Sequence, residues 1–349
     1  MRRLEEIDKV EVSAPGKIIL TGEHAVVYGK RGIAAAIDKR TYVTIKKAED
    51  KLVTIESDLF GQYSMNRNKM KKIIDRLDEL RKKKEYDRIV ELTRENPFLP
   101  IYVVVAKAED DYKPLNIGIH SSVPKSAGAS SSIYNSVAYG VSIICGKKLP
   151  TDEIAHIANE GDDIAHGKAS GIDAFTVAHG YWTTYTMKEG ARRLDVDFEL
   201  PLLIVESGEY VRTGEMVAYV KKLRKEKPEF VDSVLDRLHE ISNEFVEVLR
   251  ARDVDRIGGS FVDYREELKK LGKKLYTPKL ERICRIAEEK NAYAKPTGAW
   301  GGGICIALAR QDELKSLMET YRREGFVTFK TKLGMEGLRI ESVKSDRKA

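Results

Sequence analysis

The feature that most constrains this chain is the stretch Ser121–Ser136, which reads SSVPKSAGASSSIYNS. Before it, Leu115–Ile119 alternates apolar residues with polar or small ones, as a half-buried strand does. After it, apolar residues recur from Ile133 to Val141 at the spacing of one helix face. The sequence therefore predicts a strand, a loop of small residues and a helix, in that order.

A loop of this composition is suited to binding an anion. Small side chains let the backbone approach a ligand closely, and the free N–H groups and the dipole of a helix N-terminus favour negative charge. Ser131 and Ser132 add hydroxyl groups that could hold a phosphate oxygen or Mg²⁺. The loop is not a Walker phosphate loop, because no Gly-Lys-Ser/Thr follows Gly128. Taken alone, a solvated serine-rich turn explains the stretch equally well.

Composition and charge narrow the class of protein. The 349 residues are enough for two domains or one large one, and a hydrophobic content of 42% supports a core. The net charge of +6 arises from 61 basic and 55 acidic residues, which is too mild to indicate nucleic acid but suits an anionic substrate. The three cysteines show no CxxC spacing, as expected for buried thiols in a reducing compartment. We expect a soluble, cytoplasmic protein without a signal peptide, membrane span or nucleic-acid partner.

Two further segments connect the loop to a known family. Ser13–Asp38 reads SAPGKIILTGEHAVVYGKRGIAAAID, and Lys295–Leu308 reads KPTGAWGGGICIAL. Together with PKSAGASSS at Pro124–Ser132, these segments resemble, in order, the three motifs of the GHMP small-molecule kinases. Within that family, GEHAVVYG and HGKASGID (His166–Asp173) look most like the mevalonate kinases.

The resemblance implies an α+β fold of two domains. In the GHMP kinases the N-terminal half is like ribosomal protein S5 domain 2 and the C-terminal half is ferredoxin-like, with the active site in the cleft between them. We expect the boundary between residues 1–185 and 186–349. The sequence departs from the family motifs at two places: two glycines and a leucine of the second motif are replaced by serines and Ala129, and Trp300 stands where glycine is usual.

The resemblance also implies a nucleotide site that uses ATP and Mg²⁺. The second motif would bind the ATP phosphates through the loop residues Pro124, Lys125, Ser126, Ala127, Gly128, Ala129, Ser130, Ser131 and Ser132. Ser132 and Asp162 would hold Mg²⁺. The family usually has Glu at the position of Asp162, so a water-mediated contact is expected, since Mg²⁺ readily keeps waters. Without the family, Asp162 would be interpreted as a surface carboxylate.

Catalysis, by the same resemblance, rests on Asp173 and Lys17. Asp173 would accept the proton of the attacking hydroxyl, and Lys17 beside it would keep that carboxylate ionised and stabilise charge on the transferring group. Taken singly, Lys17 is explained as well by a solvated strand lysine, and Asp173 by a turn cap.

The acceptor side would use Glu23, His24, Thr213 and Gly298. Without the family, His24 would be interpreted as a core histidine hydrogen-bonded to backbone. The acceptor implied by resemblance is mevalonate, phosphorylated on its 5-hydroxyl in isoprenoid synthesis.

Several alternatives stay open. A phosphorylated mevalonate is one alternative acceptor, for which Lys125, Lys168 and Arg212 could supply the extra cation. A family decarboxylase is disfavoured because those enzymes lack the GEHAVVYG form of the first motif, and an inactive ATP-binding regulator is disfavoured because Lys17 and Asp173 are both present. The oligomeric state is not determined, and a homodimer is allowed.

Elsewhere the apolar spacing indicates packing helices. Residues 66–95 are dense in charge and carry an apolar stripe, which predicts one amphipathic surface helix. Its basic run, Arg81–Lys84, is interpreted as a solvated helix end rather than a nucleic-acid site. The stripes within Phe230–Val248 and Ile257–Leu271 predict two long helices that pack in a core.

Overall fold

The computed structural model describes residues 7–109, 113–167 and 169–345. The chain forms two compact units. The first unit takes the chain up to Gly16, Lys39–Gly180 and the residues from Glu336 onward, and the second takes Lys17–Asp38 and Tyr181–Met335. The expected boundary after residue 185 lies close to the division at 180 and 181, but a single cut in the sequence could not describe units built from separate segments. The prediction of an α+β fold is confirmed by mixed sheets and helices.

The first unit is built on a mixed sheet with the strand order β12-β1-β2-β5-β3-β4. The strands are β1 (Lys9–Thr21), β2 (Gly32–Lys47), β3 (Leu52–Ser57), β4 (Gly61–Asn66), β5 (Leu115–Ser121) and β12 (Arg339–Lys344). The later part of β2 pairs antiparallel with β5, and β3 pairs parallel with β5. The alternation predicted for Leu115–Ile119 is confirmed, because Leu115, Ile117 and Ile119 are buried at the centre of this sheet.

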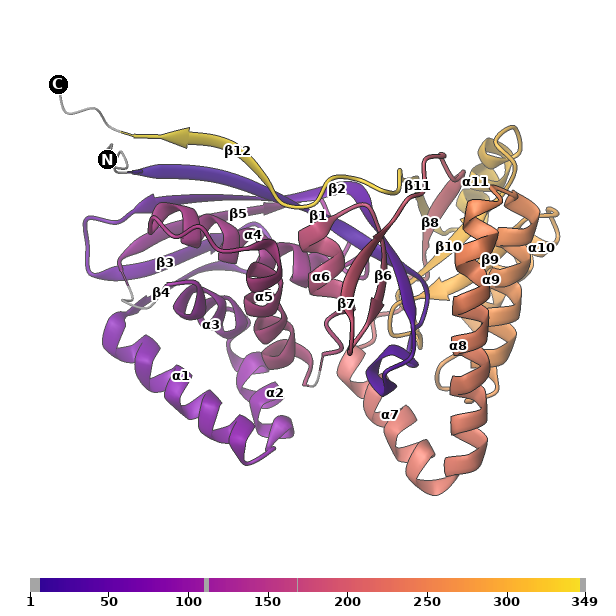
Figure 1. Ribbon diagram of the computed structural model, residues 1–349, viewed down its shortest axis with the longest axis horizontal. Coiled ribbons are helices and arrows are strands. Elements are labelled where there is room, and N and C mark those ends of the chain that lie inside the picture. The colour runs from indigo at the N-terminus through magenta and orange to yellow at the C-terminus, as the bar shows by residue number, and fades with distance from the viewer. Residues whose placement is uncertain (1–6, 110–112, 168, 346–349) are drawn as a thin grey trace. The chain divides into compact units, whose positions relative to one another are not determined.

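Helices lie on one face of this sheet (Figure 1). They are α1 (Arg67–Lys82), α2 (Tyr86–Glu95), α3 (Leu99–Ala108), α4 (Ala129–Ile144), α5 (Thr151–His166) and α6 (Ile172–His179). Apolar residues of α3, α4 and α5 pack with those of the strands in one core. Burial of this apolar surface is the main stabilising contribution to the unit.

The charged segment 66–95 forms two helices, and the prediction of one was wrong. Asn66 caps α1 by accepting a hydrogen bond from the Lys69 N–H at 2.9 Å. The chain then turns at Lys84, whose φ of 59° lies in the left-handed region and ends the helix before α2 begins. Residues of α1, including Leu77 and Leu80, are buried against α2, α3 and α5 in a small core of their own.

The second unit contains two sets of strands. β6 (Trp182–Thr186) pairs with the start of β2 and with β7 (Gly190–Leu194). A separate antiparallel sheet has the order β11-β8-β10-β9. Its strands are β8 (Leu202–Glu206), β9 (Tyr293–Thr297), β10 (Ile304–Leu308) and β11 (Val327–Lys330).

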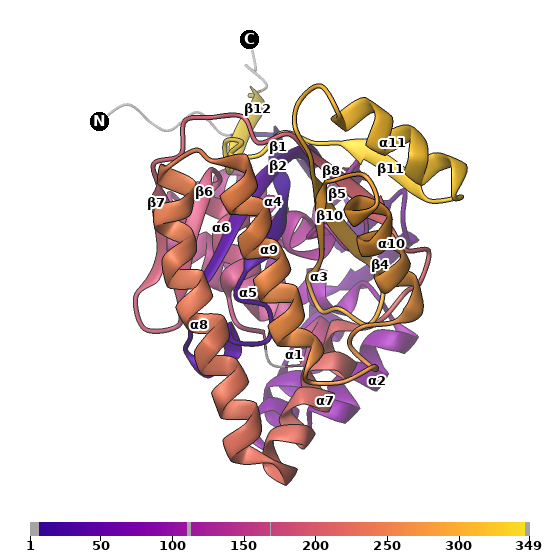
Figure 2. The ribbon, with the colours of Figure 1, turned by 90° about the vertical axis from the view of Figure 1, so that its right-hand side faces the viewer.

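Helices complete the second unit. They are the short 3₁₀ helix η1 (Val26–Tyr28) and α7 (Thr213–Glu226), α8 (Pro228–Arg250), α9 (Val254–Lys269), α10 (Pro278–Glu288) and α11 (Leu314–Arg323). Figure 2 shows α8 and α9 side by side, as the two predicted apolar stripes require. α10 and α11 bury their apolar faces with β8 and β10 in one core, and α7, α8 and α9 form another.

Candidate functional site

The predicted strand, loop and helix around Ser121–Ser136 are present in the first unit. β5 ends at Ser121 and α4 begins at Ala129. The residue before the helix is Gly128, whose φ of 85° is one that a side chain would strain. The loop is compact, since the Ala127 N–H donates to the Pro124 carbonyl at 2.8 Å. The first N–H groups of α4 therefore follow directly on a loop of small residues, as an anion site requires.

The two serines at the start of α4 have different partners. The Ser131 hydroxyl donates to Asp162 Oδ2 on α5 at 2.7 Å, and the Ser132 hydroxyl donates to the Ala14 carbonyl on β1 at 2.8 Å. The sequence predicts that Ser132 joins Asp162 around the metal, whereas the hydroxyl that donates to Asp162 in the structure is that of Ser131. The reason is helical geometry, because adjacent residues of a helix point in directions about 100° apart.

The Ser131–Asp162 pair suits a Mg²⁺ ion. Both side chains are buried, and both offer oxygen, the ligand that Mg²⁺ prefers. Within residues 7–109, 113–167 and 169–345, the structure contains no group of three or more His, Cys, Asp or Glu side chains that could hold a metal ion. A Mg²⁺ ion at this pair would complete its coordination with waters and phosphate oxygens, which is its usual behaviour.

Asp173 lies in the first turn of α6, where the helix dipole stabilises a carboxylate. Asn135, which sequence reasoning did not single out, ties this helix to α4. Its amide nitrogen donates to the Ser131 carbonyl at 2.9 Å and to the Ala174 carbonyl at 3.1 Å, and the side chain is fully buried. The signal was available in the sequence, since Asn135 is a polar residue among the apolar positions of a buried helix.

Arg81 links α1 to α5 through hydrogen bonds. The prediction that it belongs to a solvated helix end was therefore wrong. Its guanidinium donates to Glu160 Oε2 at 2.9 Å and to Asp163 Oδ2 at 3.2 Å. Burial raises the pKa of Asp163, and a hydrogen bond from the Ala169 N–H and the nearby Arg81 charge oppose that rise. Asp163 thus joins the end of α5 to the chain that leads to α6.

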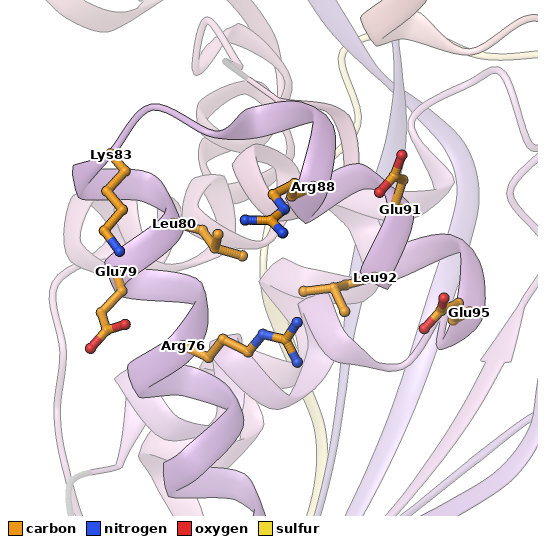
Figure 3. Close-up of a pocket in the computed structure, with 8 residues that line it drawn as sticks. All are labelled: Arg76, Glu79, Leu80, Lys83, Arg88, Glu91, Leu92 and Glu95. Carbon is orange, nitrogen blue, oxygen red and sulfur yellow. The ribbon is translucent and has the colours of Figure 1, made fainter.

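A hollow of about 460 Å³ lies between α1 and α2 (Figure 3). Leu80 and Leu92 line it, and Arg76 reaches from α1 toward Leu92. The cations Arg76, Lys83 and Arg88 are matched by three glutamates around the same hollow. This balance of charge favours no single class of ligand.

The second unit holds the residues assigned to the acceptor side and Lys17. Lys17 is a buried residue of β1 with 4% of its surface exposed. Glu23 is also buried, and its Oε1 accepts a hydrogen bond from Lys295 Nζ on β9. Burial raises the pKa of Glu23 and lowers that of Lys295, and in each case the partner's charge acts in the opposite sense. Glu23 Oε2 has no hydrogen-bond partner among the described residues.

His24 is neutral in this fold. Burial lowers its pKa to about 4, and its Nε2 lies 2.9 Å from the Ala299 carbonyl. A carbonyl can only accept, so Nε2 carries the proton and Nδ1 is left as an acceptor. The residue therefore fits the structural interpretation weighed for it, and its predicted role toward a substrate stays a prediction.

The third motif is an irregular loop between β9 and β10. Gly298 has a φ of 86°, and Trp300 adopts a φ of 62°, a region that L residues rarely occupy. The Trp300 ring is buried in the core of α7, α8 and α9, and its centroid lies 6.0 Å from that of Tyr276. The same core includes Ala25, which follows the GEH sequence of the first motif.

The remaining predicted residues are placed as follows. Thr213 is the exposed first residue of α7, and Lys125 is exposed in the loop before α4. Arg212 is half-buried just before α7, and Lys168 lies outside the described residues. Lys17 belongs to the second unit and Asp173 to the first, so their adjacency stays a prediction.

Several known proteins are similar to this chain in sequence and in fold. Residues 99–181 match the family described as GHMP kinases N terminal domain. A mevalonate kinase of Thermococcus sibiricus is 33% identical, over 96% of this chain and 99% of that protein. A mevalonate kinase of Pyrococcus furiosus is 32% identical, over 96% and 99% respectively. The chain belongs to the mevalonate kinase family.

Solved structures agree with this membership. The Methanococcus jannaschii mevalonate kinase superimposes with a TM-score of 0.76 at 25% identity, covering 96% of this chain and 100% of that one. The expectation of a GHMP kinase fold is thereby confirmed. None of the helices in the described parts of the chain is long and apolar enough to cross a membrane.

Proposed function

We propose that this protein transfers the terminal phosphoryl group of ATP to the 5-hydroxyl of mevalonate. The observation that carries the proposal is the Ser131–Asp162 pair at the N-terminus of α4, directly after a loop of small residues. This pair, which suits a cation, lies next to backbone N–H groups that suit an anion. The chain's relatives are mevalonate kinases.

Phosphoryl transfer depends mainly on positioning and charge neutralisation. When bound, ATP would supply the phosphoryl group and Mg²⁺ would neutralise its charge. The N–H groups at Gly128–Ser132 would hold the phosphates, and Ser131 with Asp162 would hold the metal. Asn135 fixes the helix of Asp173 relative to these groups through its two hydrogen bonds.

The protein's own catalytic groups are assigned from the family resemblance. Asp173 would accept the proton of the attacking hydroxyl, and Lys17 would stabilise the negative charge that develops on the transferring group. On the acceptor side, Glu23 and His24 would contribute to the substrate site, with the Nδ1 of His24 as the acceptor for a substrate hydroxyl. Both groups are buried, which strengthens the hydrogen bonds they make.

Steady-state assays with ATP test the acceptor. Mevalonate, mevalonate 3-phosphate and mevalonate 5-phosphate are compared side by side with the purified protein. We expect the highest specificity constant for mevalonate. Turnover of a phosphorylated form without turnover of mevalonate would change the substrate and keep the kinase. Absence of turnover with all three would refute the proposal.

A further inference from the structure

Arg40 is a buried arginine of β2 to which the proposed chemistry assigns no role. Only 7% of the residue is exposed. Its guanidinium donates four hydrogen bonds, to the Ser13 hydroxyl at 2.8 Å and to the carbonyls of Ser13, Glu336 and Gly337 at 3.1, 2.8 and 2.6 Å. Three of these four acceptors are backbone carbonyls. Because a guanidinium is a rigid, planar fork of donors, it fixes the course of both chain segments that it contacts.

One of these segments, which we call the strap (residues 336–338), lies against the end of α6. The Leu338 N–H donates to the Ala178 carbonyl at 3.1 Å, and Gly180, just after the helix, forms an isolated β-bridge with the first residue of the strap. The two backbones are so close that a Cβ at Gly337 would lie 2.2 Å from the Ala178 carbonyl oxygen. The Arg40 side chain therefore holds the strap, and the strap holds the C-terminal end of α6.

The backbone of Arg40 is bonded to the predicted phosphate loop. Its N–H donates to Ser122 Oγ at 3.2 Å, and its carbonyl accepts from the N–H and the hydroxyl of Ser122 at 3.1 and 3.0 Å. Ser122 directly follows β5 and begins the loop that leads to α4. At the other end of the loop, Ser132 donates to the carbonyl of Ala14, the residue after Ser13. One residue is thus bonded both to the strap and to the segments that hold the loop.

We propose that Arg40 is a positioning residue that aligns the helix of Asp173 with the phosphate loop. α6 has only eight residues, so a displacement at its C-terminal end is carried to its first turn, where Asp173 lies. Phosphoryl transfer depends on the alignment of the reacting groups, and a misplacement of about 1 Å can lower the rate about a hundredfold. The inference rests on the proposed kinase function and goes beyond it by adding a residue that touches no reacting atom.

Three substitutions separate the strap from other effects. Arg40→Met removes the four hydrogen bonds of the guanidinium, and Arg40→Lys keeps the charge without the fork of donors. Gly337→Ala leaves Arg40 in place and displaces the strap, because the added Cβ would collide with the backbone of α6. The matched control is Tyr102→Phe, which removes a buried hydroxyl of the same unit that donates to the Val53 and Tyr63 carbonyls at 3.0 and 2.9 Å.

Two measurements are made on the full chain, well below the melting temperature of each variant. Steady-state assays give kcat and the KM for ATP, with the acceptor that the parent protein phosphorylates. Hydrogen exchange followed by mass spectrometry reports how often the strap and α6 open. Because exchange needs no turnover, it tests the contact between the strap and α6 independently of the proposed function.

We expect Arg40→Met to lower kcat by about tenfold to a hundredfold. The KM for ATP should stay near that of the parent, because the backbone bonds to Ser122 do not depend on the side chain. Peptides from the strap and the end of α6 should exchange faster, while those from α3 exchange as in the parent. Arg40→Lys should recover little of kcat. Tyr102→Phe should lose stability and keep the parental kcat.

Gly337→Ala should lower kcat in the same way, and it preserves the test if Arg40→Met does not fold. The double variant Arg40→Met/Gly337→Ala should be no slower than the slower single variant, because both substitutions act on one contact.

Several results would overturn the inference: parental kcat in Arg40→Met, full recovery in Arg40→Lys, parental exchange of the strap and α6, or losses of kcat that multiply in the double variant. A loss in Tyr102→Phe as large as that in Arg40→Met would also overturn it, because any loss of stability would then be sufficient. The proposed function fails differently, through a parent protein that phosphorylates none of the acceptors tested.

Discussion

At position 300 the glycine variant should be more stable than the alanine variant, which is the reverse of the usual order for these two residues. The φ of Trp300, 62°, lies in the left-handed region, while only 1% of the residue's surface is exposed. An L residue in that region is strained by roughly 1–2 kcal/mol relative to glycine. The strain persists because the indole ring fills the core of α7, α8 and α9.

The two contributions can be separated by substitution. Removing the ring should cost about 3–5 kcal/mol in either Trp300→Ala or Trp300→Gly. Only Trp300→Gly also relieves the backbone strain, so it should be more stable than Trp300→Ala by about 1 kcal/mol. Trp300→Phe should lose least, because the indole N–H has no partner among the described residues and its burial without a partner costs about 1–3 kcal/mol.

Denaturant unfolding followed by circular dichroism measures these differences. The matched control is Trp182 on β6, which is equally buried at 2% exposed and has no positive φ. There the ordinary order should hold, with the alanine variant about 0.5–1 kcal/mol more stable than the glycine variant. If Trp300→Ala were as stable as Trp300→Gly, the argument from backbone strain would be refuted.

The remaining predictions concern catalysis, metal and pH. Asp173→Asn should lower turnover by about a hundredfold or more, as for a lost general base, while ATP binding measured by calorimetry stays near that of the parent; a variant that keeps half of the parent turnover would show that another group is the base. Lys17→Met should lower kcat, and Lys17→Arg should restore little of it because a planar guanidinium does not place charge where an ammonium does; full activity in the arginine variant would reduce Lys17 to a general electrostatic role. Excess chelator should abolish phosphoryl transfer and added Mg²⁺ should restore it, and transfer that persists in chelator would contradict a metal held by Ser131 and Asp162. Burial lowers the pKa of His24 from 6.5 to about 4, so its contribution to the free energy of unfolding is complete above pH 6.5 and is lost, by up to roughly 3 kcal/mol, as the pH falls toward 4. The stability of His24→Asn should therefore depend less on pH across this window than that of the parent. Equal pH dependence in the two proteins would mean that His24 is not the group responsible.

Local features of this protein could be predicted from its sequence because they depend on neighbours in the chain. The strand, loop and helix around Gly128 follow from apolar spacing and small residues, and the structure has them where expected. The stripes of α8 and α9 likewise reflect the helical period and the need to bury one face. The family and its fold followed from three short motifs, since such motifs keep the residue types that the chemistry needs.

The tertiary structure alone decided which of these residues meet. Nothing local distinguishes Ser131 from Ser132, and the choice of Asp162 as partner depends on how α5 packs against α4. The same holds for Trp300, whose ring direction depends on a core contributed by three other helices.

Glu23 and Lys295 are the strongest example, because 272 residues separate them in the chain. Each looks like an ordinary charged residue in its motif, and only β1 and β9 coming together buries both. Apolar patterns specify which faces turn inward, but they do not specify which buried polar groups satisfy one another. Hydrogen-bond distances must be right to within a few tenths of an ångström, and only the packed fold sets them that closely.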